Sequence, residues 1–160
     1  MRLTVNGRVH TLEVASDASL FEVLHHRLAL AGTKIACGHG ECGVCTVLLD
    51  GEIVYSCLTL AAACDDSSVV TVEGLAAPGG LAPLQRAFIA HDAAQCGYCT
   101  PGQLVAAHAL LAANAHPSEE ETREAMSGNL CRCGTYPRIL AAIHAVARGE
   151  FADEGSAGAA

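Results

Sequence analysis

Residues 37–45 read Cys37-Gly-His-Gly-Glu-Cys42-Gly-Val-Cys45, and a fourth cysteine, Cys57, follows after eleven further residues. This spacing, C-x4-C-x2-C with a distant fourth cysteine, is typical of a loop that wraps around a 2Fe-2S cluster. Glycines at positions 38, 40 and 43 let the backbone adopt positive φ, so that its N–H groups point at sulfur. The stretch therefore predicts a metal centre in a tight loop.

A second quartet of cysteines lies in the C-terminal half of the chain, with the spacing Cys96-x2-Cys99-x31-Cys131-x-Cys133. The two quartets use eight of the nine cysteines, and each can hold one metal centre. Two iron–sulfur clusters on one small chain imply electron transfer. Cys64 belongs to neither quartet, and we expect it to be a buried thiol.

Two other uses of the cysteines have to be weighed. Zinc also takes four thiolates, which would make the chain a zinc-binding interaction module, but zinc ribbons rarely use a loop this rich in glycine. A disulfide framework is disfavoured because nine is an odd number of cysteines. It is also disfavoured because Met1 to Val5 runs directly into a strand pattern with no signal peptide ahead of it.

The histidines do not form a metal site of their own. His39 lies inside the cysteine loop, but Rieske centres replace two cysteines by histidine and all four cysteines are present here. We expect His39 to be a non-ligand on the rim of the loop. His25 and His26 occupy adjacent positions of a predicted helix, and their side chains are expected to point apart.

Composition narrows the possible partners. A formal charge of -8 and a pI near 5.3 argue against nucleic acid or an anionic membrane surface. No apolar run reaches the roughly 18 residues of a membrane span. We therefore expect a cytoplasmic protein that works against another protein.

The N-terminal half predicts a small sheet with one helix. Turns at Asn6-Gly7 and Asp50-Gly51 separate strands into two hairpins. A capping box from Ser19 to Glu22 begins a helix that we expect Gly32 to stop. The predicted strands cover residues 3–5, 9–14, 46–49, 53–55 and 69–72. This order of hairpin, helix, metal loop and hairpin predicts a β-grasp, ferredoxin-like domain over residues 1–75.

Between Glu73 and Pro83 the composition changes to Gly, Ala and Pro, and strand patterns end. We expect a second domain, residues 76–150, made of four helices, and a disordered tail over residues 151–160. The helices are predicted to begin near Leu84, at Thr100-Pro101, at Ser118 and at Pro137. The fold class is α+β, a β-grasp 2Fe-2S domain followed by a four-helix 2Fe-2S-binding domain.

Four motifs carry a family resemblance. They are Cys-Gly-His-Gly-Glu-Cys-Gly-Val-Cys-Thr-Val at 37–47, Val-Glu-Gly-Leu at 72–75, Gln-Cys-Gly-Tyr-Cys-Thr-Pro-Gly at 95–102 and Gly-Asn-Leu-Cys-Arg-Cys-Gly-Thr-Tyr at 128–136. In order and spacing they resemble the iron–sulfur subunit of xanthine oxidase family molybdenum hydroxylases. The resemblance covers nearly the whole chain, and it implies that both quartets bind 2Fe-2S clusters.

The resemblance also implies partners. A large subunit would hold a molybdenum-pyranopterin, in the cytosine dinucleotide form, and hydroxylate substrate with oxygen from water; a medium subunit would hold FAD. Electrons would pass to the helical-domain cluster and then to the ferredoxin-like cluster. Gln95 and Cys133 would contact the pterin, and the rim at residues 38–41 would face the flavin. No catalytic residue is expected in this chain, which would act as the electron-transfer subunit of a hetero-oligomer.

One departure from the commonest family pattern bears on the substrate. Many members read Cys-Arg-Cys-Thr-Gly-Tyr, whereas this chain has Gly134 and Thr135 in the opposite order. The swapped pair resembles members that act on aldehydes or aromatic N-heterocycles.

Two other functions compete with the enzyme subunit, namely a free-standing ferredoxin-type carrier and the zinc module. Visible absorption distinguishes the zinc module, and co-purifying subunits distinguish the carrier.

Overall fold

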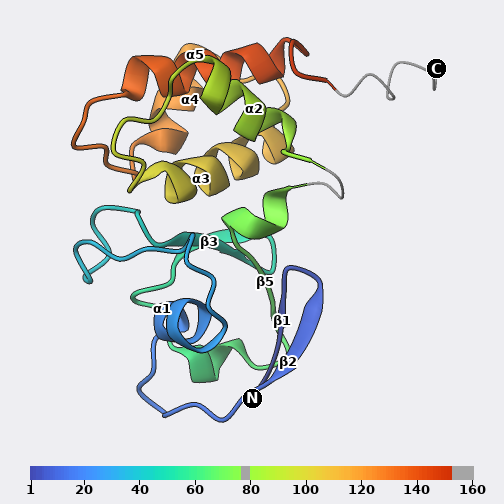
Figure 1. Ribbon diagram of the computed structural model, residues 1–160, viewed down its shortest axis with the longest axis vertical. Helices are drawn as coiled ribbons and strands as arrows, with labels where there is room; N and C mark the ends of the chain where they lie inside the picture. Colours follow the sequence, from blue (N-terminus) through green and yellow to red (C-terminus); the bar gives the residue numbers. More distant parts are fainter. Residues whose placement is uncertain (77–79, 153–160) are drawn as a thin grey trace, which may run out of the picture.

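A mixed five-stranded sheet with one short helix forms the N-terminal half of the chain, and four helices form the C-terminal half (Figure 1). The computed structural model describes residues 1–76 and 80–152. Most of the predicted tail, and part of the predicted boundary between Glu73 and Pro83, lie outside the described residues. The arrangement confirms the predicted α+β class.

The sheet has the strand order β2-β1-β5-β3-β4. Its strands are β1 Arg2–Val5, β2 Arg8–Thr11, β3 Thr46–Leu49, β4 Glu52–Tyr55 and β5 Ser68–Val70. Only the β1–β5 pair among these strands is parallel. Both predicted turns are present, with φ of 50° and 77° at Asn6 and Gly7, and 51° and 90° at Asp50 and Gly51. Strand β5 ends two residues earlier than predicted, because residues 72–75 form the 3-10 turn η3 (Val72–Leu75).

The first helix begins as predicted but ends earlier. Ser19 and Glu22 form the capping box of α1 (Leu20–Glu22), which continues as a wider π-helical turn, η1 (Val23–Arg27). The prediction that Gly32 stops the helix is wrong, because the helical backbone ends at Leu28 and Ala29 takes the left-handed conformation with φ 56°. Gly32 has a packing role instead. A Cβ there would lie 2.7 Å from Glu73 Oε1, which accepts the Gly32 N–H at 2.8 Å.

The expectation that His25 and His26 point apart is also wrong. Their rings lie edge to face, with centroids 4.9 Å apart, and both rings contact Phe21. The π-helical turn explains the difference, because each residue of a wider turn rotates less around the helix axis than in an α-helix. The ring of His25 is fixed further by a 2.7 Å hydrogen bond between its Nδ1 and the Thr33 carbonyl.

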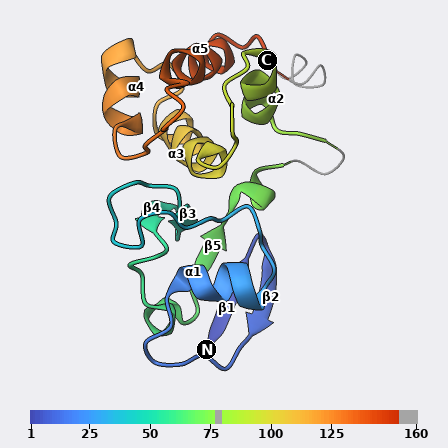
Figure 2. The same cartoon turned by 60° about the vertical axis from the view of Figure 1, so that its left-hand side comes forward.

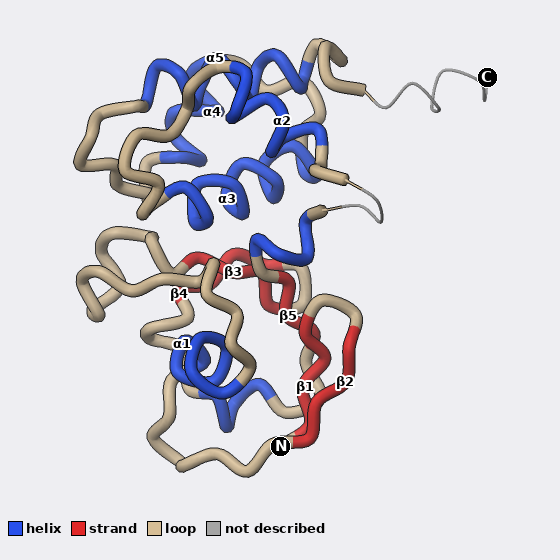
Figure 3. Tube along the Cα trace, in the orientation of Figure 1, coloured by secondary structure: helices blue, strands red, loops and turns tan. Residues whose placement is uncertain are grey.

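The C-terminal half contains the four predicted helices, shown in blue in the upper part of Figure 3. They are α2 Pro83–Ala90, α3 Thr100–Ala113, α4 Glu119–Met126 and α5 Tyr136–Ala147. Ser118 caps α4, as predicted, and it forms a capping box with Glu121. The residue that caps α3 is Cys99, one position before the expected Thr100. Among the described residues, no helix combines the length and the apolar character needed to span a membrane.

Each half has its own hydrophobic core. The N-terminal core gathers residues of β1, β3, β5, α1 and η1, and it includes Cys64, which lies in the 3-10 turn η2 (Ala61–Cys64) and is 1% exposed. Cys64 is therefore a buried thiol, as predicted. The second core lies between α2, α3, α4 and α5.

Helix α3 joins the two halves. It lies directly over β3 and η3 (Figure 2). Gly102, in its first turn, approaches the loop closely, because a Cβ at this position would lie 2.5 Å from the Gly43 carbonyl oxygen and 3.0 Å from that of Val44. The two halves therefore meet backbone to backbone beside the cysteine loop.

The substitution Gly102→Ala tests this close approach. Alanine is favoured over glycine inside a helix by up to about 1 kcal/mol, so without a clash the variant would be more stable. Because the added Cβ meets the Gly43 carbonyl, we expect a net loss of about 1–3 kcal/mol in the free energy of unfolding. Urea unfolding of the cluster-loaded protein measures it.

Ala112→Gly, at an exposed position of the same helix, is the control, and it should lose about 1 kcal/mol from helix propensity alone. A gain in stability for Gly102→Ala would contradict the close approach.

Candidate metal centres

The ferredoxin-like quartet, Cys37, Cys42, Cys45 and Cys57, lies in the loop before β3 and just after β4. Glycines 38, 40 and 43 take φ of 74°, 78° and 67°, as the sequence predicts. The backbone N–H groups of His39, Cys42 and Glu41 donate to the Cys37 thiol and lower its pKa to about 6. The loop therefore stabilises negative charge on sulfur before any metal is considered.

The thiols of this quartet fall into two pairs. Cys37 is within hydrogen-bonding reach of Cys42, and Cys45 is within reach of Cys57. A 2Fe-2S cluster with four cysteine ligands has two thiolates on each iron, so two adjacent pairs match its donor set.

The helical-domain quartet, Cys96, Cys99, Cys131 and Cys133, comes from the turns that precede α3 and α5. It also divides into pairs, Cys96 with Cys133 and Cys99 with Cys131. The pairs differ in exposure, because Cys96 and Cys133 are exposed while Cys131 is buried and Cys99 is half-buried. In Figure 1 the loops that carry both quartets lie on the same side of the molecule, in cyan, yellow-green and orange.

The protonation of the thiols shows what cluster binding requires. Burial raises the pKa of Cys45 to about 11 and that of Cys99 to about 12. Burial also raises the pKa of Cys131, but hydrogen bonds from the Thr135 side chain and backbone outweigh it and bring the value to about 7. Because metal ligands must be thiolates, loading either site releases protons and is favoured as pH rises.

The donor set fits a binuclear cluster at each quartet. The thiols stand two by two, as a cluster with two irons needs. We keep the assignment of all eight cysteines as ligands as a prediction.

Gln95 and Cys133, the predicted pterin contacts, line one surface pocket of about 260 Å³. Gln95 lies in the loop before α3, and its side chain is exposed. Gly134, with φ 76°, and Thr135 complete the turn. Arg138, whose Nη1 lies 3.9 Å from Asp92 Oδ2, also lines the pocket. The structure thus places Gln95 beside the exposed thiol pair of the helical-domain quartet.

The rim of the ferredoxin-like loop is also accessible. His39 and Glu41 are exposed, and His39 Nε2 lies 3.6 Å from Glu41 Oε2. Leu58, which is 61% exposed, packs so close to Gly40 that a Cβ there would clash with it. This rim is the part of the loop that a partner can reach.

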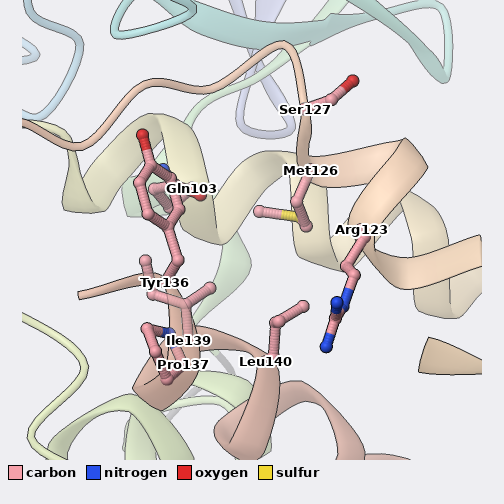
Figure 4. Close-up of a pocket in the computed structure, with 8 residues that line it drawn as sticks. All are labelled: Gln103, Arg123, Met126, Ser127, Tyr136, Pro137, Ile139 and Leu140. Atoms are coloured by element: carbon pink, nitrogen blue, oxygen red, sulfur yellow. The ribbon is translucent and has the colours of Figure 1, made fainter. Parts of the chain in front are cut away.

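Three polar residues near the quartets escaped the sequence reasoning. Thr135 hydrogen-bonds to Cys131 Sγ, Asn129 bonds across to the cysteine loop, and the fully buried Gln103 bonds to the Asn129 carbonyl. Gln103 Oε1 has no hydrogen-bond partner among the described residues. Gln103 lies at the wall of a cavity of about 470 Å³ between α3, α4 and α5, together with Met126, Tyr136 and Leu140 (Figure 4). Asn129 and Thr135 both stand in the motif at residues 128–136, but the motif itself gave no reason to expect these contacts.

Comparison with known proteins agrees with the two-site architecture. Residues 3–75 match the family described as "2Fe-2S iron-sulfur cluster binding domain", and residues 71–144 match the "[2Fe-2S] binding domain" family. The nicotine 6-hydroxylase small subunit of Paenarthrobacter nicotinovorans is 51% identical over 87% of this chain and 84% of its own.

Solved structures show the same fold. Quinoline 2-oxidoreductase from Pseudomonas putida matches with a TM-score of 0.89 and 46% identity, over 94% of both chains. The aldehyde oxidoreductase from Desulfovibrio desulfuricans matches with a TM-score of 0.88 and 44% identity, over 93% of this chain and 17% of that longer chain.

The fold and the two quartets define a two-domain protein that binds 2Fe-2S clusters. Within that class, the chain belongs to the iron–sulfur subunits of the xanthine oxidase family of molybdenum hydroxylases, and it is a subunit of an oxidoreductase.

The independence of the two sites can be tested with Cys42→Ser. Because the quartets share no ligand, the variant should lose the electron paramagnetic resonance signal of the ferredoxin-like cluster on reduction and keep that of the helical-domain cluster. Iron should fall from about four to about two atoms per chain.

The control is Cys64→Ala, which should keep both signals and lose about 1 kcal/mol of stability from a small cavity. If Cys42→Ser abolished both signals in a folded protein, the two sites would not be independent.

Proposed function

We propose that this chain is the electron-transfer subunit of a heteromeric molybdenum hydroxylase that oxidises an aldehyde or an aromatic N-heterocycle. It would take electrons from a large molybdenum-pterin subunit and pass them through two 2Fe-2S clusters toward FAD in a medium subunit, or toward another acceptor. The meeting of Gln95 and Cys133 in one surface pocket supports this most directly. The partner's pterin cofactor, in the cytosine dinucleotide form, would supply the chemistry that transfers oxygen from water.

The pocket is suited to receive electrons. Cys133 is an exposed thiol whose proposed cluster partner is the exposed Cys96, so that one iron would lie close to the surface. The exposed amide of Gln95 offers both a donor and an acceptor to a polar cofactor held by another chain. Gln95 and Cys133 would therefore orient the partner's cofactor against the first cluster.

The positions of the two quartets support one order of electron transfer. The helical-domain quartet opens to the pocket of Gln95, and the ferredoxin-like quartet opens to the rim formed by residues 38–41. An electron that enters at Cys133 would cross the chain and leave at this rim, where we place the contact with the flavin subunit. No residue of this chain is proposed to be catalytic.

The substrate class rests on relatives and on one turn. Relatives include subunits named for aldehyde oxidoreductase, nicotine 6-hydroxylase and isoquinoline 1-oxidoreductase. In this chain Gly134 takes φ 76°, and Thr135 bonds to Cys131 Sγ at 3.1 Å. The order Gly-Thr thus puts glycine at the position with positive φ and the threonine hydroxyl beside the Cys131 sulfur.

We also propose that the complex lies in the cytoplasm.

Gln95→Ala tests the entry point. Loss of one hydrogen bond to the partner's cofactor should weaken docking by about 1 kcal/mol, or roughly fivefold, and slow reduction of the clusters by substrate. Direct reduction of both clusters by dithionite should be unchanged. Stopped-flow absorbance of the purified complex measures both rates.

Glu120→Ala, a change of similar size at an exposed position of α4, is the matched control and should leave both rates unchanged. An unaltered rate of cluster reduction by substrate in Gln95→Ala would remove Gln95 from the entry site.

Dependence on partners can be tested by expressing the chain alone and with the large and medium subunits. Cluster binding is part of the folding free energy, and a partner that binds only the folded state stabilises it. We expect the lone chain to lose iron to a chelator faster and to melt at a lower temperature than the complex. Equal iron retention and equal melting would favour a free-standing ferredoxin-type carrier.

A further inference from the structure

One short segment of the helical half, residues 128–130, lies against the ferredoxin-like cysteine loop. Asn129 is 4% exposed, and its Nδ2 donates to the Gly43 carbonyl at 2.8 Å and approaches Thr46 Oγ1 at 3.0 Å. Behind it, Gln103 Nε2 of α3 donates to the Asn129 carbonyl at 2.7 Å. Both the side chain and the backbone of Asn129 are therefore held in place.

The next residue joins the two quartets directly. The Leu130 N–H donates to the Cys42 carbonyl at 2.9 Å. Leu130 is bonded covalently to Cys131, so a single hydrogen bond and a short stretch of backbone connect a predicted ligand of one cluster to a predicted ligand of the other. Cys131 belongs to the less exposed thiol pair of its quartet, and it is not among the residues that line the pocket of Gln95.

Another of the hydrogen bonds between the halves offers a longer connection. Tyr98 Oη donates to the Ile35 carbonyl at 2.7 Å. A path through this bond must cross the whole tyrosine side chain and then the backbone from Ile35 to Cys37. It therefore contains many more covalent bonds than the path through Leu130.

Resting on the function proposed above, we propose that the Leu130 N–H···O=C Cys42 hydrogen bond is the electronic bridge between the two clusters, and that Asn129 is the residue that positions it. One electron leaves the reduced helical-domain cluster, whose Fe(II) becomes Fe(III). The same electron converts one Fe(III) of the ferredoxin-like cluster to Fe(II). No bond forms or breaks, and no proton moves.

Asn129→Ala is the decisive variant. The Gly43 carbonyl keeps the Thr46 hydroxyl as a partner at 2.6 Å, so no buried acceptor is orphaned on that side. In the full chain with both clusters loaded, we expect unchanged iron content, unchanged reduction potentials and a several-fold slower electron exchange between the clusters. Rapid freeze-quench electron paramagnetic resonance after photoreduction follows the exchange. The magnetic splitting in the fully reduced protein should also decrease.

Two controls separate bridging from stability. Thr46→Val removes a hydroxyl that donates to the same Gly43 carbonyl and accepts from Asn129 Nδ2, but it leaves the Asn129 bond to Gly43 in place. Tyr98→Phe removes a different hydrogen bond between the halves, away from Asn129. Both should keep the exchange rate and the splitting of the unaltered protein. Asn129→Ser, which retains a small hydroxyl in the buried site, provides a folded variant if alanine is not tolerated, and it should also slow exchange.

The outcomes are distinct. The bridge would be overturned if the loaded Asn129 variants kept the exchange rate and the magnetic splitting of the unaltered protein. It would also be overturned if Tyr98→Phe alone slowed the exchange. Either result would leave the proposed function intact. Absence of two 2Fe-2S signals in the unaltered chain would instead refute the proposed function itself. Faster deuterium exchange at the Leu130 amide in Asn129→Ala would confirm that Asn129 holds the bond, independently of any redox reading.

Discussion

The carbonyl oxygen of Gly43 is the point on which both halves of the chain depend. It accepts hydrogen bonds from Thr46 in its own half and from Asn129 in the other, and Gly102 of α3 lies over it. A Cβ at Gly43 would collide with the Gly128 carbonyl, and φ of 67° disfavours any side chain there in any case. One glycine thus shapes the cysteine loop and allows the second domain to approach it.

This contact places the two cysteine quartets beside each other, and within each quartet the thiols differ in pKa. Each combines a thiol whose pKa is lowered by hydrogen bonds, Cys37 or Cys131, with one whose pKa is raised by burial, Cys45 or Cys99. An exposed side suits exchange with a partner, and a buried side limits the access of water and oxidants to the centre. Under the function proposed above, this asymmetry would give the chain a surface for electron entry at Cys133 and a rim at residues 38–41 for exit.

Features set by neighbours in sequence were predictable. The Asn6-Gly7 and Asp50-Gly51 turns, the capping box at Ser19 and the helix start at Ser118 all depend on local chemistry, and the structure has them where the sequence places them. The glycines of the cysteine loop follow the same logic, since their need for positive φ can be read from the motif.

Features set by distant contacts were not predictable. Gly32 was predicted to stop the helix, but the structure needs a glycine there because a side chain at this position would collide with Glu73. The π-helical turn that brings His25 beside His26 has no local signature. Asn129 lies 86 residues from its partner Gly43, so no spacing rule relates them. Its motif was recognised only as part of the resemblance, without a reason for the asparagine.

The position of β5 has a consequence for the order in which the chain assembles during synthesis. β5 is the middle strand of the sheet, and it pairs with both β1 and β3, yet it is the last strand to leave the ribosome. The two hairpins therefore remain unjoined until residues 68–70 emerge, and such long-range pairing is slow to form. Once it forms, the first domain can close while the helices are still being translated. The first cysteine quartet is then complete and accessible to iron before Asn129 exists to cover Gly43.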